Sequence, residues 1–129
     1  MPVPNIATPP RSFSPASAGN NAELEIQAFA RVIQRLEAAE PKNKMSLILA
    51  LDENLRLWAF IQSQVMSADN MLPVELRARL VSLSFWMERH TEAVLSGLAE
   101  IQGIIDVNRL VVSGLEMQVE RQTAIPVAA

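Results

Sequence analysis

The kinds of side chain that could act in catalysis or bind a metal are limited in this 129-residue sequence, and its carboxylates fall mostly on polar helix faces. The chain contains one histidine, His90, and neither cysteine nor tyrosine. A nucleophile needs a base beside it, and a metal site needs several His, Cys or carboxylate ligands at a fixed spacing. The four glycines lie too far apart for a phosphate-binding loop: Gly19, Gly97, Gly103 and Gly114. We therefore expect no catalytic residue, no metal and no cofactor, and a protein that is not an enzyme.

Two polar residues, His90 and Asn108, interrupt apolar helical patterns. A histidine in such a place can be a pH-sensitive switch or a metal ligand. No second histidine and no cysteine exists to complete a metal site, so a core histidine satisfied by a neighbour is the favoured interpretation. Asn108 can fix the register of a helical bundle at some cost in stability, or it can contact a partner.

The charge of the chain argues against nucleic acid as its main ligand. The 11 Lys and Arg are outnumbered by 14 Asp and Glu, and the basic residues are scattered among acids. Affinity for nucleic acid depends largely on clustered Lys and Arg. Charged residues make up only 19% of the chain and hydrophobic residues 50%, so we expect more apolar surface than one small core can bury.

Sequence features also predict where the protein works. A chain without cysteine suits a reducing cytoplasm. Prolines at positions 2, 4, 9 and 10 interrupt the apolar segment that a signal peptide needs, and the longest apolar run, Leu47 to Leu51, is too short to span a membrane. We expect a cytoplasmic protein without membrane insertion.

A single helical domain must position these residues, with flexible segments at its two ends. Residues 1–20 hold five of the eight prolines among Ser, Ala and Asn, a composition typical of disorder. Residues 21–120 form the helical domain, and residues 121–129 are expected to be a flexible tail. The chain is too short for a second domain with its own core.

Start and stop signals divide the domain into four helices. Asn20 or Asn21 can cap the first helix, which ends before Pro41. The other three helices are expected over residues 42–65, 73–96 and 98–119. For the third helix, Asp69 and Asn70 can cap free N–H groups, Pro73 suits the first turn, and Gly97 is the expected C-cap.

Apolar residues at helical spacing give each helix a buried face. Short connections favour antiparallel neighbours, so the expected fold class is all-α, a small antiparallel bundle of about four helices. The expected core residues are Phe29, Val32, Ile33 and Leu36; Leu51, Leu55, Trp58 and Val65; Leu76, Leu80, Leu83, Met87, His90 and Val94; and Ile101, Ile104, Ile105, Asn108, Val111, Val112 and Leu115.

Further apolar residues lie opposite these faces. Val81 and Phe85 fall across the third helix from its seam, and Leu49 and Phe60 fall on the polar face of the second helix. Either the two helices are buried on both sides, or they carry an exposed groove that receives an amphipathic helix from a partner. A homodimer would use the same surface. Trp86, at the edge of the seam, is the other aromatic candidate for partner contact.

Three short patterns, taken in order, resemble the FlaF family of bacterial flagellar biosynthesis regulators. They are Asn54-Leu55-Arg56-Leu57-Trp58, then Leu72-Pro73 followed by Leu76-Arg77-Ala78, and finally Ile105-Asp106-Val107-Asn108-Arg109-Leu110 followed by Gly114-Leu115. The resemblance covers roughly residues 36–115. It implies a protein that promotes flagellin synthesis or export after transcription, alongside the flagellin-translation repressor FlbT and in association with flagellin itself.

The resemblance and the apolar pattern together give a set of partner-binding candidates. A secretion chaperone for flagellin would cover the amphipathic terminal helices of flagellin before assembly. The alternative is direct control of flagellin mRNA through basic residues, namely Lys42, Lys44, Arg77, Arg79 and Arg89, although the net charge disfavours it. The partner-binding candidates are Leu49, Trp58, Phe60, Arg77, Val81, Phe85, Trp86, Asn108 and Arg109.

Overall fold

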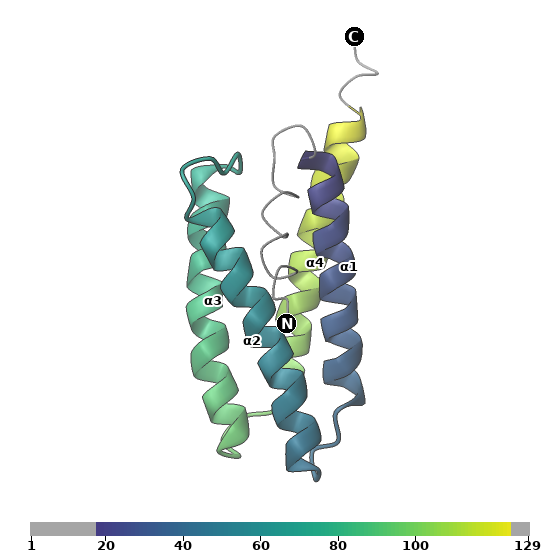
Figure 1. Cartoon of the computed structure of the whole chain (residues 1–129), viewed down its shortest axis with the longest axis vertical. Helices are drawn as coiled ribbons and strands as arrows, with labels where there is room; N and C mark the ends of the chain where they lie inside the picture. Colours follow the sequence, from purple (N-terminus) through teal and green to yellow (C-terminus); the bar gives the residue numbers. More distant parts are fainter. Residues whose placement is uncertain (1–17, 125–129) are drawn as a thin grey trace, which may run out of the picture.

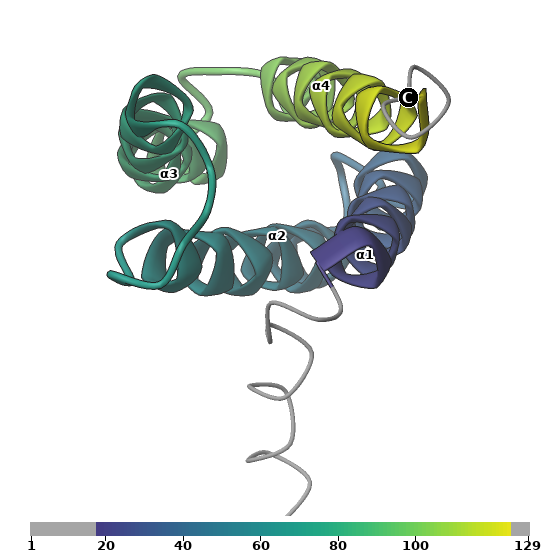
Figure 2. The ribbon, with the colours of Figure 1, turned by 90° about the horizontal axis from the view of Figure 1, so that it is seen from above.

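The computed structural model describes residues 18–124, which form a bundle of four helices (Figure 1). Neighbouring helices are antiparallel, and from above they surround a common core in the order α1, α2, α3, α4 (Figure 2). No strand occurs within these residues, so the all-α prediction is confirmed. The helices are α1 (Ala18–Ala38), α2 (Lys44–Val65), α3 (Val74–Leu95) and α4 (Gln102–Ala124).

One helix signal acts as predicted, and another was not predicted. The unpredicted one is Asn43, whose side chain caps α2 because its Oδ1 accepts a hydrogen bond from the backbone N–H of Ser46 at 3.1 Å. Gly97 ends α3 with a positive φ of 79°, which a residue with a side chain rarely adopts. The backbone N–H of Leu98 then reaches the carbonyl of Ala93 at 2.8 Å, as in a Schellman motif.

The predicted cap of α3 is wrong. Pro73 occupies the N-cap position, and no side chain caps the helix. Asn70 instead closes the preceding turn: its Oδ1 accepts from the N–H of Leu72 at 2.9 Å, and its Nδ2 donates to the carbonyl of Gln64 at 3.0 Å. An Asx turn of this kind satisfies the backbone locally. It ties the start of α3 to the end of α2.

Two helix boundaries differ from the predicted ones. The described chain is already helical at Ala18, so Asn20 and Asn21 lie inside α1 and do not cap it. The fourth helix starts at Gln102, not near residue 98, and continues to Ala124. The delay follows from Gly97, because the chain needs the next few residues to turn before α4 can begin. Residues 1–17 and 125–129, which hold most of the two segments predicted to be flexible, lie outside the described residues.

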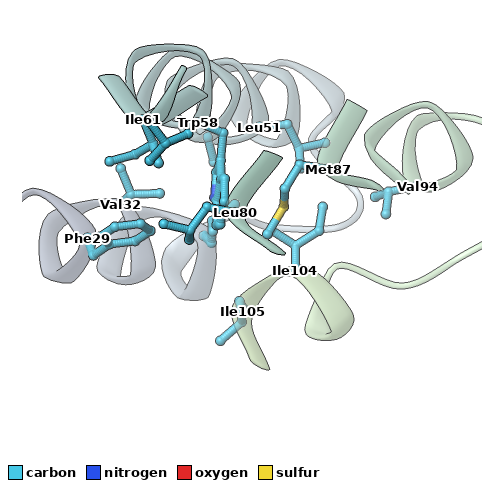
Figure 3. Packing of buried hydrophobic residues seen from close by; sticks show 13 residues of the cluster. Phe29, Val32, Leu51, Trp58, Ile61, Leu80, Met87, Val94, Ile104 and Ile105 are labelled. Atoms are coloured by element: carbon cyan, nitrogen blue, oxygen red, sulfur yellow. The ribbon is translucent and has the colours of Figure 1, made fainter. Parts of the chain in front are cut away.

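The core is built from one face of each helix (Figure 3). Trp58 of α2 is the largest fully buried side chain, and Phe29 of α1 meets it edge to face with 5.7 Å between ring centroids. On α3 the buried face is rotated from the predicted one. Ser84 and Thr91 are buried, whereas Leu83 and His90 are only half-buried. Small polar residues can face a core where the neighbouring helix leaves little space.

The pairs of helices differ in how closely they pack. Among helices that are neighbours around the bundle, contact is most extensive between α2 and α3 and between α1 and α4, and least between α3 and α4. One close approach of α3 to α4 depends on a glycine, since a Cβ at Gly103 would lie 3.2 Å from Nε2 of His90. Trp86 stacks on a face of the His90 ring, with the two ring centroids 4.4 Å apart. His90 is therefore held at the edge of the core by an aromatic neighbour.

Candidate functional site

A chain of buried hydrogen bonds joins three helices at the centre of the bundle. The indole Nε1 of Trp58 donates to Oδ1 of Asn108 at 2.8 Å. Nδ2 of Asn108 donates to Oδ1 of Asn54, also at 2.8 Å, and Nδ2 of Asn54 points to the sulfur of Met87 at 3.4 Å. All four side chains have at most 1% of their surface exposed. The network thus connects α4 to α2 and α2 to α3.

Burial decides what Trp58 and Asn108 can do. A partner cannot reach either side chain in this structure, so their place among the partner-binding candidates has no support from exposure. Polar groups buried without a hydrogen bond are costly, and paired ones specify which residues face each other. Asn108 therefore fits the register-fixing interpretation and not the partner-contact one.

A surface groove lies where the end of α1 meets the start of α2. It has a volume of about 590 Å³ and is open to solvent. Its lining is mainly apolar, with Leu49 59% and Met45 62% exposed. We call this hollow the α1–α2 groove; residues that line it include Arg35, Ala38, Ala39, Met45, Leu49, Ala50 and Glu53.

One ion pair bridges the walls of the α1–α2 groove. Nε of Arg35 on α1 lies 3.3 Å from Oε1 of Glu53 on α2. Both side chains remain partly exposed, at 59% and 40%, so the pair contributes little to stability. Glu53 Oε1 accepts no hydrogen bond from the described residues, although solvent scarcely reaches it.

Of the remaining apolar candidates, only Leu49 lines the α1–α2 groove. Leu49 faces α1, and Phe60 follows three turns later on the same side of α2, half-buried. Val81 of α3 is half-buried and packs against the core. Phe85, near Val81, is 45% exposed, whereas Trp86 packs on His90. At 100° per residue, four apolar residues on two helices need not share one surface.

The two arginine candidates have structural neighbours. Arg109 of α4 forms an ion pair with Glu37 of α1 and so braces those two helices. Arg77 is half-buried near the start of α3, and its Nε lacks a hydrogen-bond partner among the described residues. The proposed RNA-binding cations are also dispersed. Lys42 and Lys44 lie at the start of α2, whereas Arg77 lies at the start of α3, the opposite end of an antiparallel pair.

Sequence reasoning missed most of the groove. Met45 lies one turn before Leu49, and this spacing could have predicted that the two apolar side chains share one face of the helix. The pairing of Arg35 with Glu53 joins residues of different helices, and nothing in their local sequence indicates it. Across residues 18–124 no group of three or more His, Cys, Asp or Glu side chains could hold a metal ion, and no helix there is long and apolar enough to cross a membrane.

A half-buried carboxyl group on α1 makes stability depend on pH. Burial raises the pKa of Glu25 from 4.5 to about 7. In the unfolded chain the group titrates near its ordinary value, so the unfolded state loses its proton first as pH rises. The contribution of Glu25 is therefore most favourable below its ordinary pKa and is lost as pH rises through 7.

We expect Glu25→Gln to stabilise the protein above about pH 7.5 by up to about 2 kcal/mol, after allowance for partial exposure, and to change little near about pH 4. Glutamine removes the desolvated charge but keeps the size of the side chain. Urea unfolding across this pH range measures the effect. Glu23→Gln at an exposed position of the same helix is the matched control, and the same pH dependence in both variants would contradict the assignment.

Comparison with known protein families gives a match over most of the chain. A family model described as Flagellar protein FlaF matches residues 13–115, well over half of the chain. The match includes the whole of α2 and α3, the buried network and the α1–α2 groove. No curated protein and no solved structure gives a significant match.

Proposed function

The chain belongs to the FlaF family of flagellar proteins, and from this we propose that it is a non-enzymatic, cytoplasmic regulator of flagellum biogenesis. It would promote flagellin synthesis or export by binding flagellin, or by binding a partner regulator of flagellin translation such as FlbT. The observation that carries this proposal is the α1–α2 groove, a hollow with exposed apolar side chains on the surface of the bundle.

The groove has the properties of a helix-binding surface. An amphipathic helix inserts apolar side chains at i, i+3 or i+4 into such a hollow. Leu49 and Met45 are one turn apart on α2 and largely exposed, so a bound helix would remove both from water. Methionine is flexible and adapts to different partner surfaces. The terminal segments of flagellin, as amphipathic helices that need covering before assembly, suit this surface.

Direct binding to flagellin mRNA is the weaker alternative. Phosphate contacts require several cations along one surface. The basic residues considered for this role lie at both ends of the α2–α3 pair, and Lys44 donates through Nζ to the carbonyl of Leu95 at 3.4 Å. The alternative makes a different prediction about salt, since RNA affinity falls steeply as salt concentration rises, whereas apolar contact is comparatively insensitive.

We expect calorimetric titration with flagellin terminal-helix peptides to give saturable binding that Leu49→Asp weakens at least about tenfold. A carboxylate in the groove would have to be desolvated by the bound helix. Phe85→Asp is the matched control, because Phe85 is similarly exposed but lies on α3, outside the groove. Both variants are checked for folding by circular dichroism.

Other outcomes of this titration would change the proposal. Binding lost in Phe85→Asp but kept in Leu49→Asp would move the site to the outer face of α3. If flagellin peptides do not bind the folded wild type while FlbT does, the partner regulator is the direct target. Binding of flagellin mRNA that declines steeply with salt would favour the RNA alternative.

A further inference from the structure

We propose that the α1–α2 groove is also a self-association surface, through which two copies of this chain pair about a two-fold axis. The contact involves the lower end of the bundle in Figure 1, where α1 ends and α2 begins. This inference concerns the groove itself and does not depend on flagellin being the partner. Two properties of the groove support a second copy as its occupant, namely its charge pattern and its mixture of large and small side chains.

The charge pattern is complementary to itself. One wall carries the cation Arg35 and the other the anion Glu53. In a two-fold contact residue i of one copy meets residue j of the other, and j meets i. Arg35 of each copy can then approach Glu53 of the other. The guanidinium has five N–H donors, and both side chains remain partly exposed beside their own ion pair, at 59% and 40%.

The shapes are also complementary. Met45 and Leu49 are large and project into solvent, whereas the groove lining also includes the small side chains of Ala38 and Ala39. Two-fold rotation can place the large side chains of each copy against the alanines of the other. Large side chains packed against small ones interlock in helical interfaces, as ridges fit grooves.

The contact is small, which makes the association weak. Ten residues line the groove, compared with about 20–30 residues a side in a standard protein interface. The pair should therefore form only at high protein concentration and exchange readily. A helical ligand that enters the groove would displace the second copy, so self-association would keep the apolar surface covered until a partner arrives.

Sedimentation velocity over micromolar to millimolar concentrations tests this proposal with charge variants. We expect wild type to self-associate. Arg35→Glu and Glu53→Arg should each raise the dissociation constant of the pair at least about tenfold, because like charges then meet across the two-fold axis. An equimolar mixture of the two variants should form a heterodimer, because a wholly acidic groove then faces a wholly basic one. The double variant restores a self-complementary groove and should associate like wild type.

The mixture excludes misfolding as the explanation, since unfolded variants would not recover association. Leu110→Asp, at a residue 72% exposed on α4, is the matched control and should leave association unchanged. The proposal is overturned if wild type stays monomeric throughout, if the two charge variants associate as wild type does, or if the mixture gives no heterodimer. None of these results bears on flagellin binding, which the titration measures separately.

Discussion

Trp58→Ala is expected to lower the free energy of unfolding by about 3–5 kcal/mol, the largest effect of any single substitution considered. The side chain is 1% exposed and packs edge to face against Phe29, so its removal leaves a cavity between α1 and α2. It also leaves Oδ1 of Asn108 without its indole donor. Because domains of this size are stable by only about 5–15 kcal/mol, a large part of the stability is lost.

Urea unfolding followed by far-UV circular dichroism measures this loss without relying on the tryptophan signal. Trp86→Ala is the matched control, because Trp86 is half-buried at the edge of the bundle and stacks on His90. We expect it to cost clearly less than Trp58→Ala. Equal losses from the two variants would mean that Trp58 is not the centre of the core.

Asn108→Leu is expected to lower the free energy of unfolding by about 2–4 kcal/mol, although leucine is apolar and similar in size. The reason is that two buried groups lose their partner, the Nε1–H of Trp58 and the Oδ1 of Asn54. The same substitution at an exposed position would cost far less. A change in the free energy of unfolding below about 0.5 kcal/mol would therefore place Asn108 outside the core.

A double-mutant cycle tests whether the two asparagines act together. Asn54→Leu combined with Asn108→Leu removes both members of the 2.8 Å hydrogen bond, so no unpaired amide of either residue remains. We therefore expect the double variant to cost less than the sum of the single variants. Strict additivity would show that the two side chains do not interact in the folded protein.

Trp58→Ala and Asn108→Leu also distinguish an effect on stability from an effect on partner binding. Trp58 and Asn108 belong to the patterns that resemble the FlaF family, yet both are buried and lie outside the groove. Variants that remain folded at low temperature should therefore bind a groove ligand as wild type does. Leu49→Asp should behave in the opposite way, with little change in stability and a large change in binding.

Local sequence predicts the four helices but not all of their boundaries. Pro73 and Gly97 bracket α3 by backbone chemistry alone, and this bracket was predictable within a residue or two. The role of Asn70 was not, because its side chain had two sets of backbone groups within reach and closes the turn after α2 instead of capping α3. Which of two local hydrogen bonds forms depends on how the helices meet.

The buried face of α3 shows the same limit. Leu80, Met87 and Val94 were correctly assigned to the core from their heptad spacing. Between them, hydrophobicity favoured Leu83, but Ser84 is the buried residue. Residues 83 and 84 differ by 100° around the helix. Which of them is buried depends on how α3 is rotated against α2, and the sequence of α3 alone does not specify that rotation.

The sequence by itself determined the fold class, the four helices, most of the core and the family, because these follow from periodicity, turn residues and short local patterns. Only the tertiary structure decided which surface is open. It buried Trp58 and Asn108 in one hydrogen-bonded network and brought Arg35 of α1 beside Glu53 of α2. It also placed Leu49 and Phe85 on different faces. Contacts between helices depend on their rotation and crossing, which local sequence does not specify.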